Sequence, residues 1–248
     1  MTEPLLRLEE LVVEFADPHR RVRAVDGVSL EIGAGDILGL VGESGSGKTT
    51  LAKTVLRLYR PHSGRILLQG RDITHLGEAA LRPLRRHAQM VFQDPLSSFN
   101  PRHTIGRALA IPMRLHGVAR PVPDVLADVG LPAGFADRYP HQLSGGQLQR
   151  AAIGRALSLS PALIVADEAV SKLDVSVRAQ ILNLLRRVHA ERGVSLLFIT
   201  HDLHVARFLC HRIGVMRAGR LLEIGPTAQV FASPAHEYTR TLLGTIVT

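Results

Sequence analysis

The amino-acid sequence predicts an α/β fold in which helices cover a mostly parallel sheet, and three observations predict it. Short apolar runs alternate with longer helical patterns through much of the chain. One run leads through a glycine-rich loop into a helix, as strands do in β-α units. The stretch from residue 94 to residue 143 lacks strand signals and is punctuated by prolines, which predicts short helical pieces inserted into the core.

The expected elements follow in order from the N-terminus. Residues 5–15 and 28–32 read as strands around the polar loop 17–23, which predicts a small antiparallel layer. The core should then pair each strand with the helix after it, namely 36–41 with 49–59, 163–166 with 175–190, and 195–199 with 203–210, and one more helix is expected at 148–157.

These elements are assigned to a single domain over residues 1–248. The α/β core and its antiparallel layer take residues 1–93 and 161–248, and the inserted helical subdomain takes residues 94–160. Although 46% of the residues are hydrophobic, the longest apolar runs are far too short to cross a bilayer. No basic-then-apolar leader opens the sequence, so a cytosolic location is expected.

The net charge of +8 could suggest nucleic acid as a partner, but its distribution argues against that. The basic residues are scattered without a block of like charges, and only Lys48, Lys53 and Lys172 are lysines. With 4% aromatic residues and no tryptophan, stacking platforms for bases are scarce. The lone cysteine, Cys210, lies among apolar helical neighbours and is expected to be a buried structural thiol.

The glycine-rich loop carries the first chemistry, since it has the strand-loop-helix context of a phosphate-binding P-loop. Glycines let backbone N–H groups point at phosphate oxygens, and the helix N-terminus adds partial positive charge. Lys48 should reach the β- and γ-phosphates, and the Thr49 hydroxyl should ligate Mg²⁺. An ordinary glycine-rich turn is the alternative. The nucleotide-binding residues expected here are Gly42, Ser44, Gly45, Ser46, Gly47, Lys48, Thr49 and Thr50.

Two carboxylates end a later apolar strand. Asp167 and Glu168 should point in different directions because side chains alternate along a strand. One can hold magnesium, while the other polarises an attacking water. A solvated turn is the alternative for such a pair taken alone, and the P-loop upstream favours the catalytic interpretation.

A second helix N-terminus that contains glycines follows Leu143. Ser144, Gly145, Gly146 and Gln147 stand just before the expected helix and suit a phosphate. One chain needs only one cradle for a γ-phosphate, so the second makes sense if it closes over a nucleotide held by another subunit.

With these motifs, nearly the whole chain resembles the ABC ATPase family. The resemblance implies a P-loop NTPase core with an N-terminal antiparallel β layer and an inserted α-helical subdomain, and ATP with Mg²⁺ as cofactors. It implies that Glu168 is catalytic with Gln93 and His201, where Gln93 senses Mg²⁺ and His201 contacts the γ-phosphate. Thr49, Gln93 and Asp167 are the expected metal-binding residues.

The same resemblance extends to two nucleotide-binding positions and two departures. Phe15 stands where the family stacks an aromatic ring on adenine, and Asp174 belongs to a loop that crosses the dimer interface. Lys172 replaces a small residue in that loop. Leu148 replaces a basic residue and is expected to change the surface near the second phosphate motif.

The residues 91–102, 167–171 and 233–243 resemble the nickel, dipeptide and oligopeptide importer branch. Peptide-type members often continue past the last of these motifs with an extension that can carry cysteines, and the end at Thr248 tilts the expectation slightly toward nickel or metal chelates. The implied partners are a second, different ATPase subunit, two transmembrane permease subunits and, indirectly, an extracytoplasmic solute-binding protein, with no nucleic acid. The chain would then act peripherally at the cytoplasmic face of the cell membrane.

Three alternatives remain open at this stage. A soluble ABC-type ATPase acting on DNA or ribosomes would tend to carry a long coiled-coil insertion or two cassettes, and neither is seen. A P-loop kinase or GTPase would leave the second phosphate motif and His201 unexplained. His201 and His204, one helical turn apart, could instead be a metal pair.

Overall fold

The computed structural model describes residues 3–17 and 20–244, and the chain divides into two compact units. The first comprises Met1–Leu81 with Ser195–Thr248, and the second comprises Arg82–Val194. Residues 94–160, the expected helical subdomain, fall within the second unit together with strands from either side of them.

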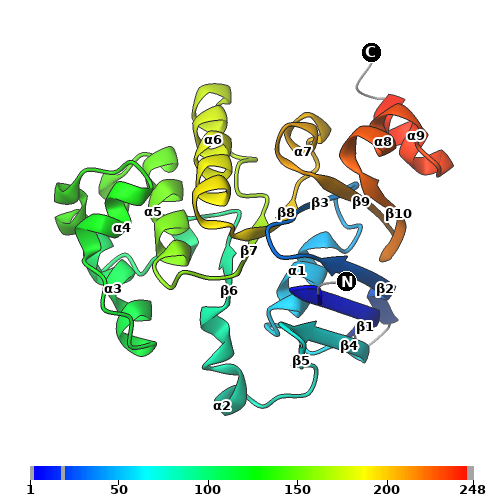
Figure 1. Ribbon diagram of the computed structural model, residues 1–248, viewed down its shortest axis with the longest axis horizontal. Coiled ribbons are helices and arrows are strands. Elements are labelled where there is room, and N and C mark those ends of the chain that lie inside the picture. The colour runs from blue at the N-terminus through cyan, green and yellow to red at the C-terminus, as the bar shows by residue number, and fades with distance from the viewer. Residues whose placement is uncertain (1–2, 18–19, 245–248) are drawn as a thin grey trace. The chain divides into compact units, whose positions relative to one another are not determined.

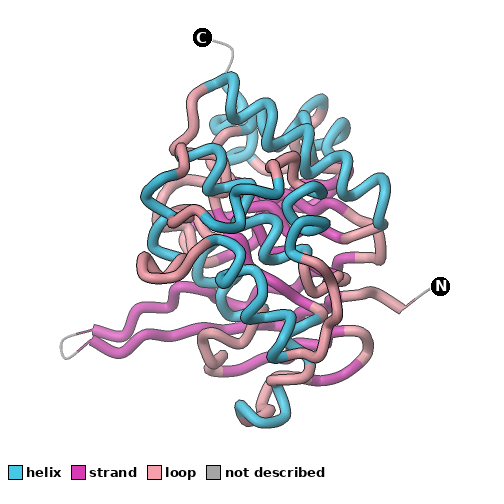
Figure 2. Tube along the Cα trace, turned by 90° about the vertical axis from the view of Figure 1, so that its left-hand side faces the viewer, coloured by secondary structure: helices cyan, strands magenta, loops and turns pink. Residues whose placement is uncertain are grey.

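The first unit opens with an antiparallel sheet in the order β2-β1-β4-β5, so the expected antiparallel layer is confirmed (Figure 1). Its strands are β1 (Leu6–Asp17), β2 (Arg20–Ile32), β4 (Ser63–Leu68) and β5 (Arg71–Asp72). The strand expected at 28–32 begins eight residues earlier, and Figure 2 shows β1 and β2 continuing together as a long ribbon.

Cross-strand pairing is the reason for this longer strand. Phe15 lies opposite Val22, and Glu14 lies opposite Arg23. Arg23 Nε is 2.6 Å from Glu14 Oε1, so a charged sequence that resembles a loop is held as a strand. Residues 18 and 19 of the expected loop lie outside the described residues.

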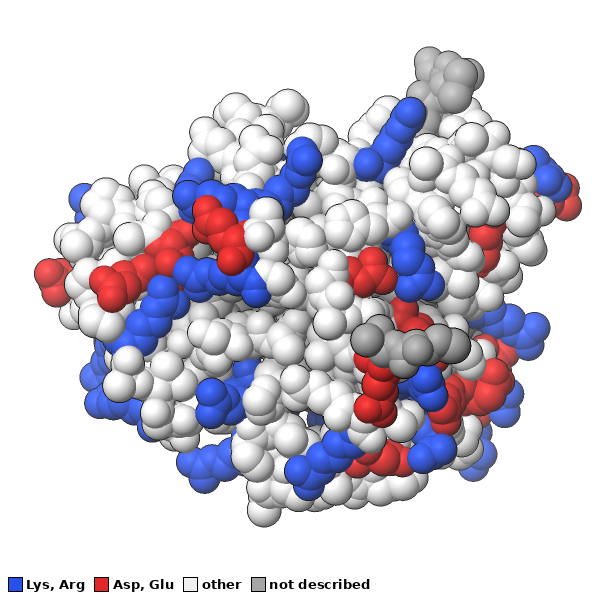
Figure 3. All heavy atoms as spheres, in the orientation of Figure 1, with Lys and Arg blue, Asp and Glu red and all other residues white. Residues whose placement is uncertain are grey.

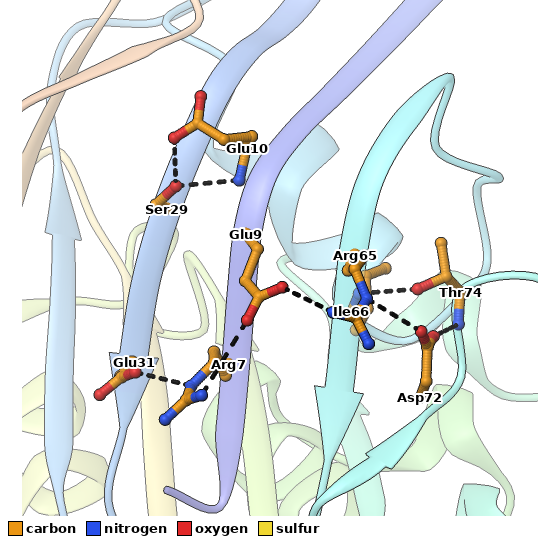
Figure 4. A network of polar contacts seen from close by, with 9 residues as sticks. All are labelled: Arg7, Glu9, Glu10, Ser29, Glu31, Arg65, Ile66, Asp72 and Thr74. Carbon is orange, nitrogen blue, oxygen red and sulfur yellow. Dashed lines mark hydrogen bonds and ion pairs between the residues drawn. The ribbon is translucent and has the colours of Figure 1, made fainter.

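Charged side chains on this layer are paired across the strands (Figure 4). Arg7 Nε lies 2.7 Å from Glu31 Oε1, and Arg65 contacts both Glu9 and Asp72, at 3.3 and 3.2 Å. Such exposed pairs contribute at most about 1 kcal/mol each. They neutralise much of the local charge, and on the face in Figure 3 basic and acidic side chains are interspersed, as the sequence predicts.

A second sheet of the first unit positions the glycine-rich loop. Its strands run in the order β10 (Arg220–Pro226), β9 (Arg212–Arg217), β3 (Ile37–Val41) and β8 (Ser195–Ile199). β3 pairs in parallel with β8 and β9, and every residue of β3 and β8 is buried. α1 (Lys48–Val55) contacts β8, β1 and β2, and α7 (Leu203–Leu209) contacts β3, so helices flank this sheet as α/β folds require.

The helix expected at 49–59 is shorter in the structure, because α1 ends at Val55. Arg57 takes a left-handed conformation with φ of 54°, which a helix cannot continue. Its buried guanidinium donates to the carbonyls of Ile73 and Tyr59, at 3.0 and 3.3 Å. The chain therefore leaves the helix to satisfy a buried cation, which helical periodicity does not reveal.

The second unit holds the parallel strands β6 (Ala88–Val91) and β7 (Leu163–Asp167) and the helices α3 to α6 (Figure 1). Residues 94–143 are fully described and contain no strand, as predicted. α5 begins at Gly145, three residues before its expected start, and contacts β6, α3, α4 and α6. The other helices are α3 (Ile105–Leu115), α4 (Val122–Asp128) and α6 (Val175–Arg192), with 3-10 turns at Leu84–Arg86, Leu96–Ser98, Ala133–Asp137 and Pro140–Gln142.

The chain ends in two short helices of the first unit, α8 (Thr227–Ala232) and α9 (Glu237–Gly244), and α2 (Glu78–Leu81) precedes the second unit. Within residues 3–17 and 20–244, no helix combines the length and the apolar character that a membrane crossing requires.

Cys210 is buried behind β3, as expected. A methyl group at Gly39 would lie 2.7 Å from its Sγ, so glycine is needed for the thiol to fit against the strand. Burial raises the pKa of the Cys210 thiol to about 12, which keeps it protonated and unreactive. The predicted burial of this thiol is confirmed.

Core burial in the first unit gives the first prediction. Phe198 in β8 is fully buried, so Phe198→Ala should lower the free energy of unfolding by about 3–5 kcal/mol. The matched control is Phe208→Ala, whose ring is 47% exposed and whose loss should cost less than about 1 kcal/mol. Urea denaturation followed by circular dichroism measures both, and equal losses would contradict the assigned burial.

Candidate functional site

The glycine-rich loop joins the buried end of β3 to the start of α1. Gly42, Gly45 and Gly47 all have positive φ, at 149°, 81° and 101°. Such angles strain residues that carry a Cβ, so these glycines allow the loop to curl over the helix N-terminus. Ser44 and Gly45 are exposed in the loop, Ser46 is buried within it, and Thr49 and Thr50 lie in the first turn of α1, which begins at Lys48.

Close packing fixes the shape of this loop. A Cβ on Gly42 would lie 2.2 Å from the carbonyl oxygen of Met216, and a Cβ on Gly47 would lie 2.2 Å from that of Ala24. Gly219 connects the loop to β2. Its N–H donates to Ser46 O of the loop at 3.0 Å, and its carbonyl accepts from Asp26 N of β2 at 2.9 Å. The loop is thus held by β9, by the turn after it and by β2.

Lys48 lies at the centre of the loop. Its buried ammonium donates to the carbonyls of Gly42 and Glu43, at 2.8 and 2.7 Å, and to Ser46 Oγ at 3.0 Å. A compact cation held by a ring of oxygens at a helix N-terminus is well placed to neutralise a phosphate.

The end of β8 lies beside this loop because β3 and β8 are parallel neighbours, with Leu40 opposite Ile199. Thr200 N donates to Leu40 O at 3.1 Å, and the exposed His201 follows. Asp202 caps α7 by accepting from the N–H groups of His204 and Val205. The structure therefore brings His201 and the glycine-rich loop to one edge of one sheet.

Metal ligation gains no support from the two histidines. Among the described residues, no group of three or more His, Cys, Asp or Glu side chains could hold a metal ion by itself.

Phe15 lies near the tip of β1 and is 41% exposed, which excludes a core role for its ring. Tyr59 packs edge-on against it, with ring centroids 5.3 Å apart and planes at 83°. Lys53 of α1 places its ammonium 5.6 Å from the Tyr59 ring. Sequence reasoning missed Tyr59, because only the fold brings the residue after α1 beside β1.

In the second unit, the carboxyl ends of β6 and β7 bring Gln93 and Glu168 together. The strands pair in register with Val91 opposite Ala166, and Gln93 Nε2 donates to Glu168 Oε2 at 2.8 Å. Asp167 is buried at the end of β7, whereas Glu168 is half-buried and has a positive φ of 46°. A strained backbone at a carboxylate is typical of functional sites.

Ser171 is the residue of this cluster that sequence reasoning named only as part of a motif. Its hydroxyl donates to Glu168 O at 3.0 Å and lies 3.4 Å from Gln93 Nε2. It therefore supports the backbone of Glu168 and the amide of Gln93 at once. The sequence signal beside that motif was a hydroxyl three residues after Glu168, since serine side chains commonly bond to a nearby backbone group.

The loop after this cluster leads into α6. Asp174 caps the helix, since its Oδ1 accepts from Val177 N at 2.9 Å and from Ser176 Oγ at 2.7 Å. Lys172 is exposed in the same loop. The Val177 backbone N–H, followed by the Ser176 hydroxyl, lowers the pKa of the Asp174 carboxyl.

The second phosphate motif is the capped start of α5. Ser144 Oγ accepts from Gln147 N at 3.3 Å, and Gln147 Oε1 accepts from Ser144 N at 3.0 Å, which forms a capping box. Ser144 and Gly145 are exposed. A Cβ on Gly146 would lie 2.4 Å from Val177 Cγ1, so this glycine allows α5 to approach the start of α6.

Leu148 does not change the surface near this motif, contrary to the expectation. Its side chain is buried, because the position faces the helices of the second unit once α5 begins at Gly145. Arg155, two turns further along α5 on the same face, donates to Ser98 O at 2.5 Å and lies over the Phe99 ring at 4.5 Å. The helix of the second phosphate motif is thereby tied to the segment that follows Gln93.

In the first unit, one sheet edge carries the glycine-rich loop, Lys48 and His201. In the second unit, the ends of β6 and β7 carry Gln93, Asp167 and Glu168. These features define a P-loop nucleotide-binding protein with an additional helix N-terminus suited to phosphate. The family model described as ABC transporter matches residues 25–171, more than half of the chain. The chain belongs to the ABC transporter family, as its ATP-binding component.

Two curated relatives are similar over most of this chain. The oligopeptide transport ATP-binding protein AppF of Bacillus subtilis is 47% identical over 232 residues, which are 91% of this chain and 70% of that protein. The glutathione import ATP-binding protein GsiA of Escherichia coli K12 is 46% identical over 257 residues, which are 98% of this chain but 41% of that protein. The chain therefore spans less than half the length of the glutathione import proteins it matches.

Solved ATP-binding cassettes share the fold. A dimeric cassette, MJ0796, in a post-hydrolysis state bound to ADP and Pi has a TM-score of 0.82 and 28% identity, covering 90% of this chain and 98% of that one. The cassette cbiO1 of Clostridium perfringens, part of the transporter complex cbiONQ, has a TM-score of 0.82 and 26% identity, covering 99% of this chain and 98% of that one. The predicted fold class is confirmed.

The packing of the glycine-rich loop predicts a difference between two glycines. A left-handed conformation costs a residue with a Cβ roughly 1–2 kcal/mol, so Gly45→Ala, which meets nothing within 4 Å, should lose about that much. Gly47→Ala should lose clearly more stability, because its methyl group would collide with Ala24 O and move the backbone. Thermal unfolding without nucleotide compares them, and equal losses would contradict the assigned packing.

The capping of α6 predicts a pH dependence. The pKa of Asp174 is lowered from its ordinary 3.8, so the stabilising effect of its charge is complete above that value and is lost as the pH falls through the folded-state pKa. Asp174→Asn keeps a capping oxygen without the charge. Wild type should exceed this variant in urea midpoint at pH 6, and the difference should shrink at pH 3. A difference that stays constant would exclude charge-assisted capping.

Proposed function

We propose that this chain is the ATP-hydrolysing subunit of an ABC importer and works as one half of a dimer that encloses two ATP molecules. One observation carries the proposal: the chain has two helix N-termini suited to phosphate, the loop around Lys48 and the start of α5 capped by Ser144. A single nucleotide needs only the first. The second is accounted for if it closes over the ATP of a partner subunit.

ATP would bind to the first unit. The N–H groups of the curled loop (Gly42, Ser44, Gly45, Ser46, Gly47) and the start of α1 (Thr49, Thr50) cradle the phosphates, and Lys48 exchanges carbonyl oxygens for phosphate oxygens. Phe15 offers an exposed ring face to adenine, held in orientation by Tyr59. Ser144, Gly145, Gly146, Gln147 and Asp174 would contact the nucleotide of the partner subunit across the interface.

Magnesium fits the residues available. The Thr49 hydroxyl, the Asp167 carboxylate and the Gln93 amide supply hard oxygen ligands, as Mg²⁺ prefers, and phosphate oxygens would complete the coordination. The ion would neutralise charge on the β- and γ-phosphates.

Hydrolysis would use Glu168 as the group that polarises the attacking water. Gln93 Nε2, 2.8 Å from Glu168 Oε2, fixes the direction of this carboxylate, and the Ser171 hydroxyl holds the Glu168 backbone carbonyl. His201, at the sheet edge beside the glycine-rich loop, would contact the γ-phosphate. Phosphoryl transfer requires mostly positioning and charge neutralisation, which these groups provide.

Coupling to transport would run through the segment after Gln93. Leu96 is exposed there, while Arg155 binds the same segment to α5 through Ser98 and Phe99. A displacement of this segment by a permease would therefore be transmitted to α5, the helix of the second phosphate motif. The proposed partners are two transmembrane permease subunits, a second ATPase subunit of different sequence and, indirectly, an extracytoplasmic solute-binding protein, at the cytoplasmic face of the membrane.

The proposed cargo is a short peptide or glutathione, because the relatives AppF and GsiA are named for the transport of oligopeptides and the import of glutathione. This replaces the slight preference for nickel. The test measures ATP turnover by the complex reconstituted with its permeases and binding protein. Oligopeptide or glutathione should stimulate this turnover. Stimulation by a nickel chelate alone would overturn the proposal of a peptide or glutathione cargo. Co-purification with nucleic acid rather than hydrophobic membrane subunits would instead favour a soluble ATPase acting on DNA or ribosomes.

The catalytic role of Glu168 gives a sharper prediction. Glu168→Gln should retain ATP binding and favour an ATP-bound dimer, while turnover falls by about 10²–10⁴-fold as expected for loss of a general base. Glu191→Gln, an exposed substitution of the same kind on α6, is the control and should keep wild-type turnover. Phosphate release and size-exclusion chromatography with ATP measure both effects. Near-normal turnover in Glu168→Gln would refute the assignment.

A further inference from the structure

The segment 233–243 marks the importer branch in the sequence but has no role in the proposed catalytic cycle. It forms the turn before α9 and most of that helix. Two of its residues, Tyr238 and Thr239, are buried, at 6% and 1% exposure. Buried polar side chains in a terminal helix call for a physical reason.

The Tyr238 hydroxyl reaches the glycine-rich loop. It is buried, makes no hydrogen bond of good geometry, and has as its polar neighbours the backbone N–H and the carboxylate of Glu43, the second residue of that loop. The Arg217 guanidinium lies over the Tyr238 ring, 4.5 Å from its centroid. Burial, as the main cause, raises the pKa of Tyr238, so the phenol stays protonated and can donate to the carboxylate.

Glu43 is also the residue that holds the loop lysine. Its carbonyl accepts from Lys48 Nζ at 2.7 Å. Tyr238 is therefore a neighbour of the same residue whose carbonyl accepts from the ammonium expected to bind phosphate. A shift of Glu43 would be passed directly to Lys48.

The remainder of the segment fixes α9 in place. Glu223 of β10 accepts from the N–H groups of Ala235 and His236, at 2.8 and 3.1 Å, and His236 Nδ1 accepts from Tyr238 N at 3.0 Å. β10 pairs with β9, which supplies Arg217 and the Met216 carbonyl that packs on Gly42. These contacts hold the start of α9 on β10, and Arg217 of the neighbouring strand β9 packs on the ring of Tyr238.

We propose that Tyr238 is a positioning residue for nucleotide binding, which orients Glu43 and through it Lys48, so that the segment 233–243 buttresses the glycine-rich loop. The proposal rests on the proposed binding of ATP to this loop. The buttress reduces the motion that the loop must give up when phosphate binds, and it acts on affinity rather than on the chemical step.

The test is Tyr238→Phe, which keeps the ring and removes the hydroxyl. Loss of one hydrogen-bonding group predicts a rise of about three- to ten-fold in the Kd of fluorescent ATP and in the KM for ATP, with kcat and the Tm of the nucleotide-free protein unchanged. Thr241→Val, which removes an exposed hydroxyl one turn along α9, is the matched control and should leave Kd unchanged.

A double-mutant cycle with Glu43→Gln makes the test specific. If Tyr238 acts through Glu43, the effects of the two substitutions on Kd fall short of additive. Additive effects, an unchanged Kd in Tyr238→Phe, or an equal change in Thr241→Val would each overturn the inference. Failure of the wild type to bind ATP would instead refute the proposed function, so the two failures are distinguishable.

Discussion

The close approach of the glycine-rich loop to two carbonyl oxygens is the constraint on which the rest of this structure depends. Met216 O and Ala24 O occupy the space where a Cβ of Gly42 or Gly47 would stand, so the loop can curl only with glycine at both positions. That curl turns the carbonyls of Gly42 and Glu43 inward and creates the oxygen cage around the Lys48 ammonium. Chemistry at the loop therefore begins with backbone packing.

Several elements distant in sequence serve this constraint. β2 supplies Ala24, β9 supplies Met216, and Gly219 in the turn after β9 bonds to the loop at Ser46 and to β2 at Asp26. Strand β8 then adds His201 at the same sheet edge, because parallel neighbours end together. The long pairing of β1 with β2 is part of the same arrangement, since it fixes the strand that carries Ala24 and the strand that carries Phe15.

The second unit shows a different principle, in which a reactive group is held by polar neighbours. Glu168 adopts a positive φ, and Gln93 and Ser171 support its carboxylate and its carbonyl. The start of α5 approaches α6 because Gly146 lacks a Cβ that would strike Val177. Arg155 then binds α5 to the segment after Gln93. A mechanical link between the carboxylate cluster and the second phosphate motif follows from these contacts within one compact unit.

The sequence by itself determined the fold class, the order of the core elements and the motifs, because glycine spacing, strand-end carboxylates and helix caps are local features. It did not predict that β2 starts at Arg20, that α1 ends at Val55 or that Leu148 is buried, since cross-strand pairing, the buried Arg57 and the packing of α5 decide these points. The contacts of Tyr59 with Phe15 and of Tyr238 with Arg217 join residues 44 and 21 positions apart. Only the tertiary structure could supply them, because no local pattern encodes which distant side chains meet.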